Sequence, residues 1–286
     1  MPELPEVEVT CRGIAPALTG RRLTQVVLRV PALRYPLPAA GDLAGKTLLA
    51  VRRRGKYLLF DFSSVVTPAS GHESSSKLRF GAGHLLVHLG MSGSLRLVKA
   101  GQAAEKHDHV DLVFGATALR LRDPRRFGAM LWIEGDPFAH PLLASLGVEP
   151  LSPAFTAQRL GSALSGRKAA IKPCLMDAHV VVGVGNIYAS ESLFLAGIDP
   201  RRAAGRVSRE RLERLVPAIR KTLRAAIAAG GSSLRDFAHA DGELGCFQTR
   251  HRVYDREGLP CPACGTTIRA IRQGQRSTYF CPRCQR

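Results

Sequence analysis

The chain has 286 residues, with 41 Lys or Arg against 23 Asp or Glu, so its formal net charge is +18. This length allows two or three domains, and the positive excess favours a polyanionic partner, nucleic acid ahead of a membrane or an acidic protein. Seven cysteines are too few for a disulfide framework in so long a chain, and no apolar run is long enough to span a membrane.

The first ten residues, MPELPEVEVT, combine two prolines with three carboxylates. They have neither the positive start nor the apolar core of a secretory signal, so we expect a cytoplasmic protein. If Met1 is removed, Pro2 becomes a secondary amine, which is a nucleophile, and Glu3 lies one residue from it. Residues 6–20 are expected to form a helix that ends at Gly20.

The rest of the first half is expected to be mostly β-structure. Short β-branched or alternating runs lie between turn residues, at 24–30, 46–62, 84–90, 109–114 and 118–123. They are too many and too short for βαβ units, which favours an antiparallel sandwich or barrel. The stretch 63–83, rich in Ser and Gly, is expected to be a surface loop.

After about residue 135 the pattern becomes helical. Residues 208–231 carry apolar side chains on one helical face, with Ser208 as the N-cap and Gly230 as the stop. Residues 186–197 predict a second helix, and 233–237 carry a capping-box pattern. The last forty residues are polar, rich in Arg and contain cysteines, so we expect a small separate module.

Two pairs of cysteines in this module predict a metal site. CPAC (261–264) and CPRC (281–284) are separated by sixteen residues, which is the spacing of a structural Zn²⁺ site with four thiolate ligands: Cys261, Cys264, Cys281 and Cys284. Such a site leaves no open coordination position for catalysis, so the module must act through the side chains on its surface. The link is long enough for a β-hairpin and carries three arginines that suit contact with nucleic acid, Arg269, Arg272 and Arg276.

The stretch VVVGVGNIY (180–188) is not a dinucleotide-binding motif, because Tyr188 stands where the third glycine belongs and no βαβ pattern flanks it. It predicts a Gly-rich turn that enters a helix at Asn186. Backbone N–H groups at a helix start can hold a phosphate, although an ordinary capped turn explains the same residues.

Three further stretches suit contact with DNA. His107, His109 and Asp111 alternate, which would place them on one face of a strand, as phosphate donors ahead of metal ligands. The turns RDPRRFGAM (122–130) and HLGMSGSL (88–95) present Arg125, Arg126, Phe127 and Met91, which suit a wedge that unstacks bases, although a Met or Phe that faces the core explains them equally well. Lys56 follows a glycine at the start of an apolar strand, where an amine can clamp a phosphate or carry a proton, although a solvated surface lysine is the commoner case.

Eight motifs occur together and in order over nearly the whole chain: PELPEVE, RRGKYLL, HLGMSGSL, EKHDHVDL, DPRRFGA, AIKPCLMD, VVGVGNIYASESLF and the four-Cys ribbon. In these the sequence resembles formamidopyrimidine-DNA glycosylase, a family of bacterial repair enzymes. The resemblance implies an α+β multidomain fold with double-stranded DNA bound in the cleft between its halves. It implies an N-terminal antiparallel β-sandwich at 1–134, a helix-two-turn-helix domain at 135–240, and a capping-loop end with the zinc finger at 241–286.

The resemblance also assigns the chemistry. It makes Pro2 the nucleophile that attacks C1′ of the damaged nucleotide, and Glu3 the acid that helps open the sugar. An α-amine has a pKa of about 8, well below that of lysine, so more of it is neutral and nucleophilic. Lys56 matches the lysine that donates a proton in β-elimination, and Arg276 matches the arginine of δ-elimination.

Other positions match DNA contacts of the family. His107, Arg125 and Arg167 match positions that contact DNA, and Asn186 matches a phosphate-binding position. Met91, Arg125 and Phe127 match the residues that fill the gap left by the flipped base. The implied reaction is excision of oxidised purines, 8-oxoguanine and formamidopyrimidines, through a Schiff base, followed by strand cleavage at the abasic site. Two features depart from the family pattern: the 63–83 loop is long, and Cys246 stands where an aromatic residue is expected.

Three other functions remain open. Endonuclease VIII shares the fold and the proline chemistry but prefers oxidised pyrimidines, and its N-terminus has Gly where this chain has Leu4. A non-enzymatic zinc-ribbon protein explains the charge and the cysteines but not the N-terminal motif. An N-terminal-proline tautomerase explains Pro2 alone. We expect a monomer that associates with the bacterial nucleoid through DNA and does not bind membranes.

Overall fold

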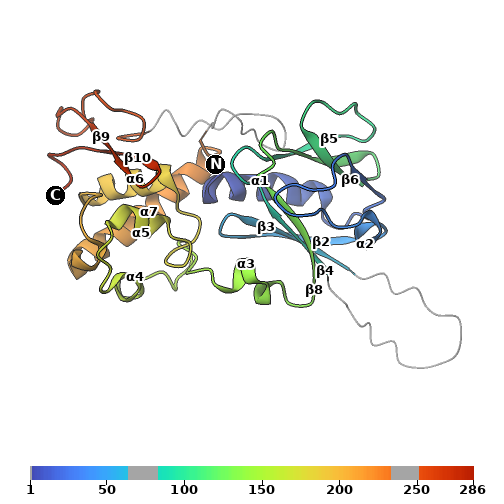
Figure 1. Cartoon of the computed structure of the whole chain (residues 1–286), viewed down its shortest axis with the longest axis horizontal. Helices are drawn as coiled ribbons and strands as arrows, with labels where there is room; N and C mark the ends of the chain where they lie inside the picture. The colour runs from blue at the N-terminus through green and yellow to red at the C-terminus, as the bar shows by residue number, and fades with distance from the viewer. Residues whose placement is uncertain (1, 64–82, 233–250) are drawn as a thin grey trace, which may run out of the picture. The chain divides into compact units, whose positions relative to one another are not determined.

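The computed structural model describes residues 2–63, 83–232 and 251–286, and the chain divides into two compact units (Figure 1). Unit 1 contains Pro2 and the described residues of 7–144, and unit 2 contains residues 3–6 and the described residues of 145–286. The predicted capping box, most of the 63–83 loop and Cys246 lie outside the described residues. The domain borders at 134 and 240 stay predictions.

Unit 1 consists mainly of two four-stranded antiparallel sheets with the strand orders β1-β6-β7-β5 and β2-β3-β4-β8. The first sheet contains β1 (Gln25–Leu28), β5 (Ser94–Lys99), β6 (Asp108–Phe114) and β7 (Thr117–Arg122). The second contains β2 (Leu48–Arg54), β3 (Tyr57–Phe62), β4 (Gly83–His88) and β8 (Ala129–Glu134). The predicted antiparallel sandwich is confirmed.

One apolar core joins both sheets and α1 (Leu4–Leu18), whose residues from Val7 onward belong to unit 1. Ile14 and Leu18 of the helix pack with Phe60 and Leu112, one from each sheet. The spacing of the apolar residues along α1 explains this contact, because every third or fourth side chain faces the same way. The described part of unit 1 also contains three short helices: α2 (Ala40–Leu43), η1 (Pro137–Ala139) and α3 (Pro141–Ala144).

The elements predicted in the first half of the chain needed three corrections. The run 46–62 is a hairpin of β2 and β3, which turns at Gly55 with φ +59°. Strands β5 and β8 were missed, because each follows directly on a glycine-containing turn whose local signal obscured the strand after it. The helix predicted at 6–20 begins two residues earlier, at Leu4, so that Pro5 lies in its first turn, where a missing N–H costs nothing.

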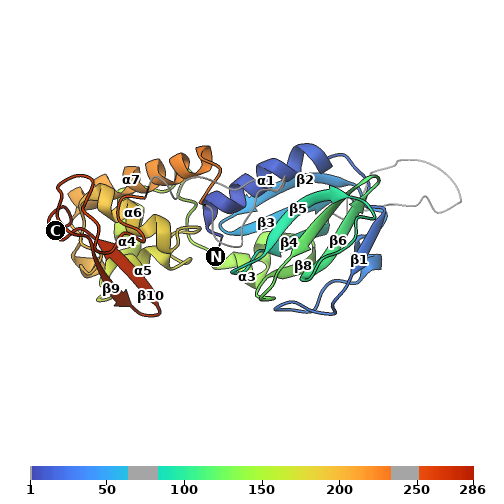
Figure 2. The ribbon, with the colours of Figure 1, turned by 90° about the horizontal axis from the view of Figure 1, so that it is seen from above.

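Unit 2 is mainly helical. It contains α4 (Ala157–Leu164), α5 (Ile171–Met176), α6 (Asn186–Ala196), η2 (Ala204–Arg206) and α7 (Arg209–Ala228), with α6 and α7 side by side (Figure 2). Both predicted long helices are confirmed: Ser208 accepts a cap bond from the Arg211 N–H, and Gly197 closes α6 with φ +68°. Within the described residues, no helix is long and apolar enough to cross a membrane.

The C-terminal module is attached to α6. Its strands β9 (Arg269–Gln273) and β10 (Arg276–Phe280) form the predicted antiparallel hairpin. Phe194 of α6 packs with Val253 and Ile268 in a small core that also includes ligand cysteines. The buried carboxylate of Glu191 accepts hydrogen bonds from the backbone N–H groups of residues 252–254, at 2.9–3.0 Å. One helix therefore holds the module through both apolar and polar contacts.

Candidate active site and nucleic-acid interface

The side chain of Glu3 lies at the start of α6, although 182 residues separate Glu3 from Gly185. Its carboxylate accepts from the N–H groups of Gly185 at 2.8 Å, Ile187 at 3.0 Å and Tyr188 at 3.4 Å, and it is only 3% exposed. Unpaired N–H groups and the partial positive charge of a helix N-terminus stabilise an anion. The chain thus holds the Glu3 carboxylate in a fixed, charged setting directly after Pro2.

The glycines of the VVVGVGNIY stretch make this contact possible. A Cβ on Gly185 would lie 2.3 Å from the Glu3 carboxyl carbon, and one on Gly183 would lie 2.5 Å from the Cβ of Leu4. Of the two interpretations left open for this helix start, a phosphate site is disfavoured at the N–H groups of Gly185, Ile187 and Tyr188, because they already bind the carboxylate of Glu3. The role of the Asn186 side chain as a DNA contact stays a prediction.

Glu6 fixes the backbone of the same segment, and the sequence analysis missed it. Its fully buried carboxylate accepts from the Glu3 N–H at 2.8 Å, the Tyr188 hydroxyl at 2.5 Å and the Ser232 N–H at 2.9 Å. The signal in the sequence was its place as third residue of α1, from which a carboxylate reaches back to the residue before the helix. Glu3 is therefore held by both its side chain and its backbone.

A second polar cluster of unit 2 surrounds Lys172 of α5, which the sequence analysis did not single out although the AIKPCLMD motif contains it. The Nζ of this buried lysine donates to Asn186 Oδ1 at 2.6 Å, Ser277 O at 2.9 Å and Thr278 Oγ1 at 2.7 Å. Burial lowers the pKa of Lys172 to about 8; nearby Glu3 opposes this shift and Arg276 adds to it. Lys172 thus ties Asn186 to the finger hairpin.

Arg276 begins β10 and is exposed. It lines a cavity of about 210 Å³ together with Lys172, Met176, Asp177 and Gln273. Two cationic side chains at one cavity suit a phosphate oxygen. Arg167 is half-exposed and donates to Asp177 Oδ2 at 2.9 Å, so one edge of its guanidinium is already paired.

The predicted wedge residues lie in two turns of unit 1. Met91 lies between β4 and β5 and is partly exposed, and Arg125 and Phe127 lie between β7 and β8. Phe127 is 46% exposed, and the Arg125 guanidinium stacks over its ring at 4.7 Å. An exposed aromatic ring backed by a cation is the shape that the unstacking role requires.

The expected alternation of His107, His109 and Asp111 on one strand face was wrong for His107. That residue precedes β6 and has φ +75°, a conformation outside any strand. His109 is buried against the Asp123 carbonyl at 2.9 Å, and Asp111 pairs with Arg120. Only His107 remains partly exposed, so the contact with DNA predicted at this motif rests on it alone.

Lys56 lies in the turn before β3, close to a histidine that the sequence analysis overlooked within HLGMSGSL. His88 accepts at Nδ1 from the Gly90 N–H at 3.0 Å, and its ring lies 4.8 Å from that of Tyr57. Burial lowers the pKa of His88 to about 4, with further contributions from Lys56 and Arg34. His88 is therefore a neutral ring at physiological pH, with Nε2–H as its donor.

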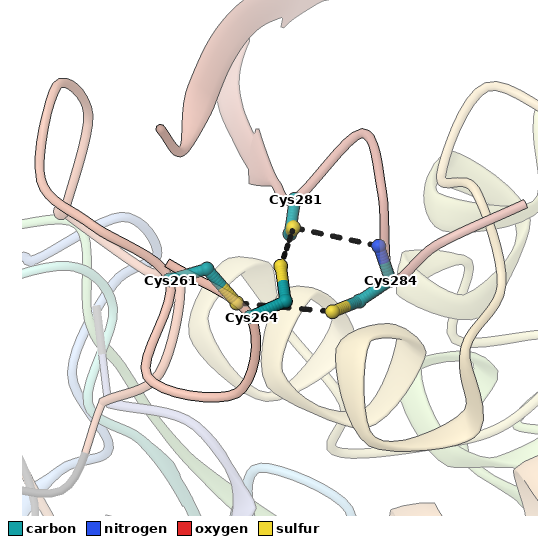
Figure 3. A group of neighbouring side chains, drawn as sticks. All are labelled: Cys261, Cys264, Cys281 and Cys284. Carbon is teal, nitrogen blue, oxygen red and sulfur yellow. Dashed lines mark hydrogen bonds between the residues drawn. The ribbon is translucent and has the colours of Figure 1, made fainter. Parts of the chain in front are cut away.

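The four predicted ligand cysteines meet at one point of the C-terminal module (Figure 3). Their sulfur atoms all lie within 4.8 Å of one another; Cys261 and Cys284 are 3.9 Å apart, and Cys264 and Cys281 are 3.5 Å apart. Tetrahedral Zn²⁺ with Zn–S bonds of about 2.3 Å requires sulfur atoms roughly 3.8 Å apart. All four are free thiols, so the donor set fits one structural zinc.

Comparison with known proteins explains why these elements occur in one chain. Residues 1–130 match the formamidopyrimidine-DNA glycosylase N-terminal domain, residues 146–238 match the H2TH domain of that enzyme, and residues 258–286 match the zinc finger found in FPG and IleRS. The formamidopyrimidine-DNA glycosylase of Aromatoleum aromaticum is 58% identical over 288 residues, and that of Thiobacillus denitrificans is 57% identical over 289, each with full coverage of both chains. The chain belongs to the formamidopyrimidine-DNA glycosylase family.

Solved structures of the family have the same fold. The MutM (Fpg) protein of Thermus thermophilus matches with a TM-score of 0.85 and 39% identity, over 99% of this chain and 98% of that one. The Lactococcus lactis Fpg in complex with abasic-site DNA matches with a TM-score of 0.84 and 31% identity, over 99% of each chain. As a member of this family, the chain is a DNA glycosylase of base excision repair that binds DNA and holds one structural zinc.

Proposed function

We propose that the chain excises oxidised purines from duplex DNA with Pro2 as nucleophile and then cleaves the abasic strand. The observation that carries the proposal is the anchored Glu3 carboxylate, held by three backbone N–H groups at the start of α6. The secondary amine of Pro2 supplies a nucleophile, and the buried, oriented carboxylate of the next residue supplies a proton acceptor.

The Pro2 nitrogen attacks C1′ and the bond from C1′ to the base breaks, with the electron pair leaving on the base, which takes a proton from water. Glu3, resting as a carboxylate, takes the proton that the attacking nitrogen loses and passes it to the sugar ring oxygen. The ring then opens to a cationic iminium. The nearby carboxylate stabilises this cation, and the cation acidifies the C2′ proton for β-elimination of the 3′ phosphate.

Lys56 and Arg276 complete the proposed chemistry. Lys56 supplies the proton for β-elimination, and Arg276 binds the phosphate that leaves in δ-elimination. The charge of Lys56 contributes to the lowered pKa of His88, so the His88 ring stays neutral while Lys56 is charged. Arg276 shares its cavity with Lys172, so a phosphate there meets two cations.

The preference for purines is proposed on the sequence motifs. The HLGMSGSL and DPRRFG motifs and Leu4 favour the purine enzyme over endonuclease VIII. The solved complexes of the L. lactis protein do not decide the preference, because a mutant was solved with Fapy-dG containing DNA and the wild type with an oxidised pyrimidine containing DNA. Single-turnover excision from matched duplexes with 8-oxoguanine or thymine glycol tests the preference; faster release of thymine glycol would reverse it.

Borohydride trapping tests the nucleophile. The mature protein, incubated with a lesion duplex and borohydride, is expected to give a covalent complex whose DNA remnant maps to Pro2 by mass spectrometry after proteolysis. A protein whose Pro2 nitrogen is blocked by a retained Met1 or a tag should give no complex, because an amide nitrogen is not nucleophilic. An adduct on Lys56, or equal trapping of the blocked protein, contradicts the proposal.

A further inference from the structure

Ser92 and Asp123 connect the two turns of unit 1 that carry the wedge residues. Ser92 follows Met91 in the turn between β4 and β5, and Asp123 opens the turn that carries Arg125 and Phe127. The Ser92 hydroxyl donates to Asp123 Oδ1 at 2.8 Å and accepts from the Arg125 N–H at 3.2 Å. A single buried hydroxyl therefore joins both turns.

Asp123 has 0% exposure and hydrogen bonds through both its side chain and its backbone. Its Oδ2 accepts from the Gly128 N–H at 2.8 Å, and its own N–H donates to the carbonyl of His107 at 3.1 Å. Its carbonyl accepts from His109 Nε2 at 2.9 Å and from the Arg126 N–H at 3.2 Å. The same aspartate thus also holds the loop that presents His107.

The two turns touch along their backbones. A Cβ on Gly90 would lie 2.4 Å from the carbonyl carbon of Phe127, and one on Gly128 would lie 2.9 Å from the His88 carbonyl oxygen. Nothing larger than glycine fits at this contact. The backbone contact and the Ser92–Asp123 bond therefore fix the turns to each other from two sides.

We propose that Ser92 and Asp123 are positioning residues for base eversion, because they hold Met91, Arg125 and Phe127 as one rigid wedge. This inference rests on the wedge role proposed for those three side chains. Unstacking a base is costly, and a wedge that must first be ordered loses part of its binding free energy to that ordering. Pre-organisation by the buried pair removes this loss.

Ser92→Ala tests the inference, with Ser94→Ala as its matched control. Ser94 is equally buried, but its hydroxyl has no hydrogen-bond partner within the described residues. Single-turnover excision of 8-oxoguanine from a fully paired duplex should slow about tenfold or more in Ser92→Ala, which leaves Asp123 Oδ1 and the Arg125 N–H unpaired, and about twofold or less in the control. Fluorescence of 2-aminopurine next to the lesion, which reports unstacking, should fall in parallel.

A second substrate separates positioning from general damage. When the lesion lies opposite a gap, eversion meets less resistance, so the deficit of Ser92→Ala should shrink. Asp123→Asn keeps the shape of the side chain but turns one acceptor into a donor, and it should show the same pattern. Wild-type excision by both variants, or an equal deficit on both substrates, overturns the inference.

Phe127→Ala distinguishes failure of the positioning role of Ser92 and Asp123 from failure of the wedge role itself. If Phe127→Ala keeps both the excision rate and the fluorescence change, the wedge role itself is wrong. If Phe127→Ala loses both while Ser92→Ala and Asp123→Asn keep them, the wedge role stands and only the positioning role fails.

Discussion

The backbone N–H of Glu3 donates to the buried carboxylate of Glu6 at 2.8 Å, while the carboxylate of Glu3 accepts the N–H groups at the start of α6. The two glutamates thus serve different helices: Glu6 caps the first turn of α1, and Glu3 caps α6. Pro5 fits between them because the first turn of a helix needs no N–H donor. The unusual composition of the first residues is therefore explained by an anchored N-terminal segment.

Tyr188→Phe is expected to loosen this anchor. The fully buried hydroxyl donates to Glu6 Oε1 at 2.5 Å, and burial beside Glu6 raises the pKa of Tyr188 well above 10, so the donor persists at every physiological pH. Removing it should lower the free energy of unfolding by about 1–3 kcal/mol, measured by urea denaturation. Tyr279→Phe is the control, because its hydroxyl makes a longer bond of 3.3 Å to Asp255 near the surface. Equal losses in the two variants contradict the prediction.

Much of the fold could be predicted from local sequence patterns, whereas the contact between Glu3 and the start of α6 could not. The helices at 186–197 and 208–231, the sandwich and the zinc site are each encoded by periodicity, caps or spacing over short stretches. No local signal pairs Glu3 with Gly185, because that contact joins segments far apart in the chain. The glycines suggested a phosphate site for the same reason: a helix start that suits an anion does not reveal which anion binds it.

The resemblance to a known family identified some site residues that local patterns alone do not. Pro2, Glu3 and Lys56 were singled out by motif, but their catalytic roles stay predictions. Glu6, His88 and Lys172 lie inside the motifs, but no prediction named them. Glu6 had a signal in its place as the third residue of α1, whereas His88 and Lys172 act through hydrogen bonds that no local pattern predicts.

His88 should make stability depend on pH. Burial lowers its pKa to about 4 in the folded state, against an ordinary value of 6.5. Between these two pKa values the unfolded chain binds a proton at His88 and the folded chain does not. The contribution of the neutral ring to the free energy of unfolding is therefore complete above pH 6.5 and is lost as the pH falls towards 4. His88→Asn keeps an acceptor for the Gly90 N–H and does not titrate. The stability of the wild type relative to this variant should fall by about 3 kcal/mol between pH 7 and 4.

Urea denaturation of both proteins at pH 7, 5.5 and 4 measures this difference. His179→Asn provides the matched control, because it makes the same substitution at an exposed histidine. A constant difference between wild type and His88→Asn over the whole range would show that His88 titrates like an ordinary histidine.

Removal of zinc should unfold the C-terminal module and weaken DNA binding at the same time. Four thiolates without a metal do not hold a small module together, since metal binding supplies its folding free energy. Metal analysis should find about one zinc per chain in the wild type and in Cys174→Ala, which lies outside the site, and much less in Cys264→Ser. If a zinc-free Cys264→Ser protein kept its full affinity for DNA, binding would not depend on the folded module, and the prediction would be wrong.

Gly185→Ala should disturb the active site without changing any residue to which a catalytic role is assigned. Gly185 has φ −123°, which alanine adopts without strain, so the only new feature is a Cβ that would lie 2.3 Å from the carboxyl carbon of Glu3. Because overpacking forces neighbouring groups to shift, we expect Glu3 to leave the helix start and the free energy of unfolding to fall by about 1–3 kcal/mol. Single-turnover base excision should fall about tenfold or more, while affinity for lesion DNA changes far less.

Gly41→Ala is the matched control for this substitution, because it lies in a helix with open space around the position of its Cβ. It should leave excision unchanged. The decisive comparison is with Glu3→Gln, which keeps the volume of the side chain but removes its charge. If the position of the carboxylate matters as much as its presence, Gly185→Ala and Glu3→Gln should both lose excision and both still bind DNA. Excision at the wild-type rate by Gly185→Ala would mean that Glu3 acts from a place other than the start of α6.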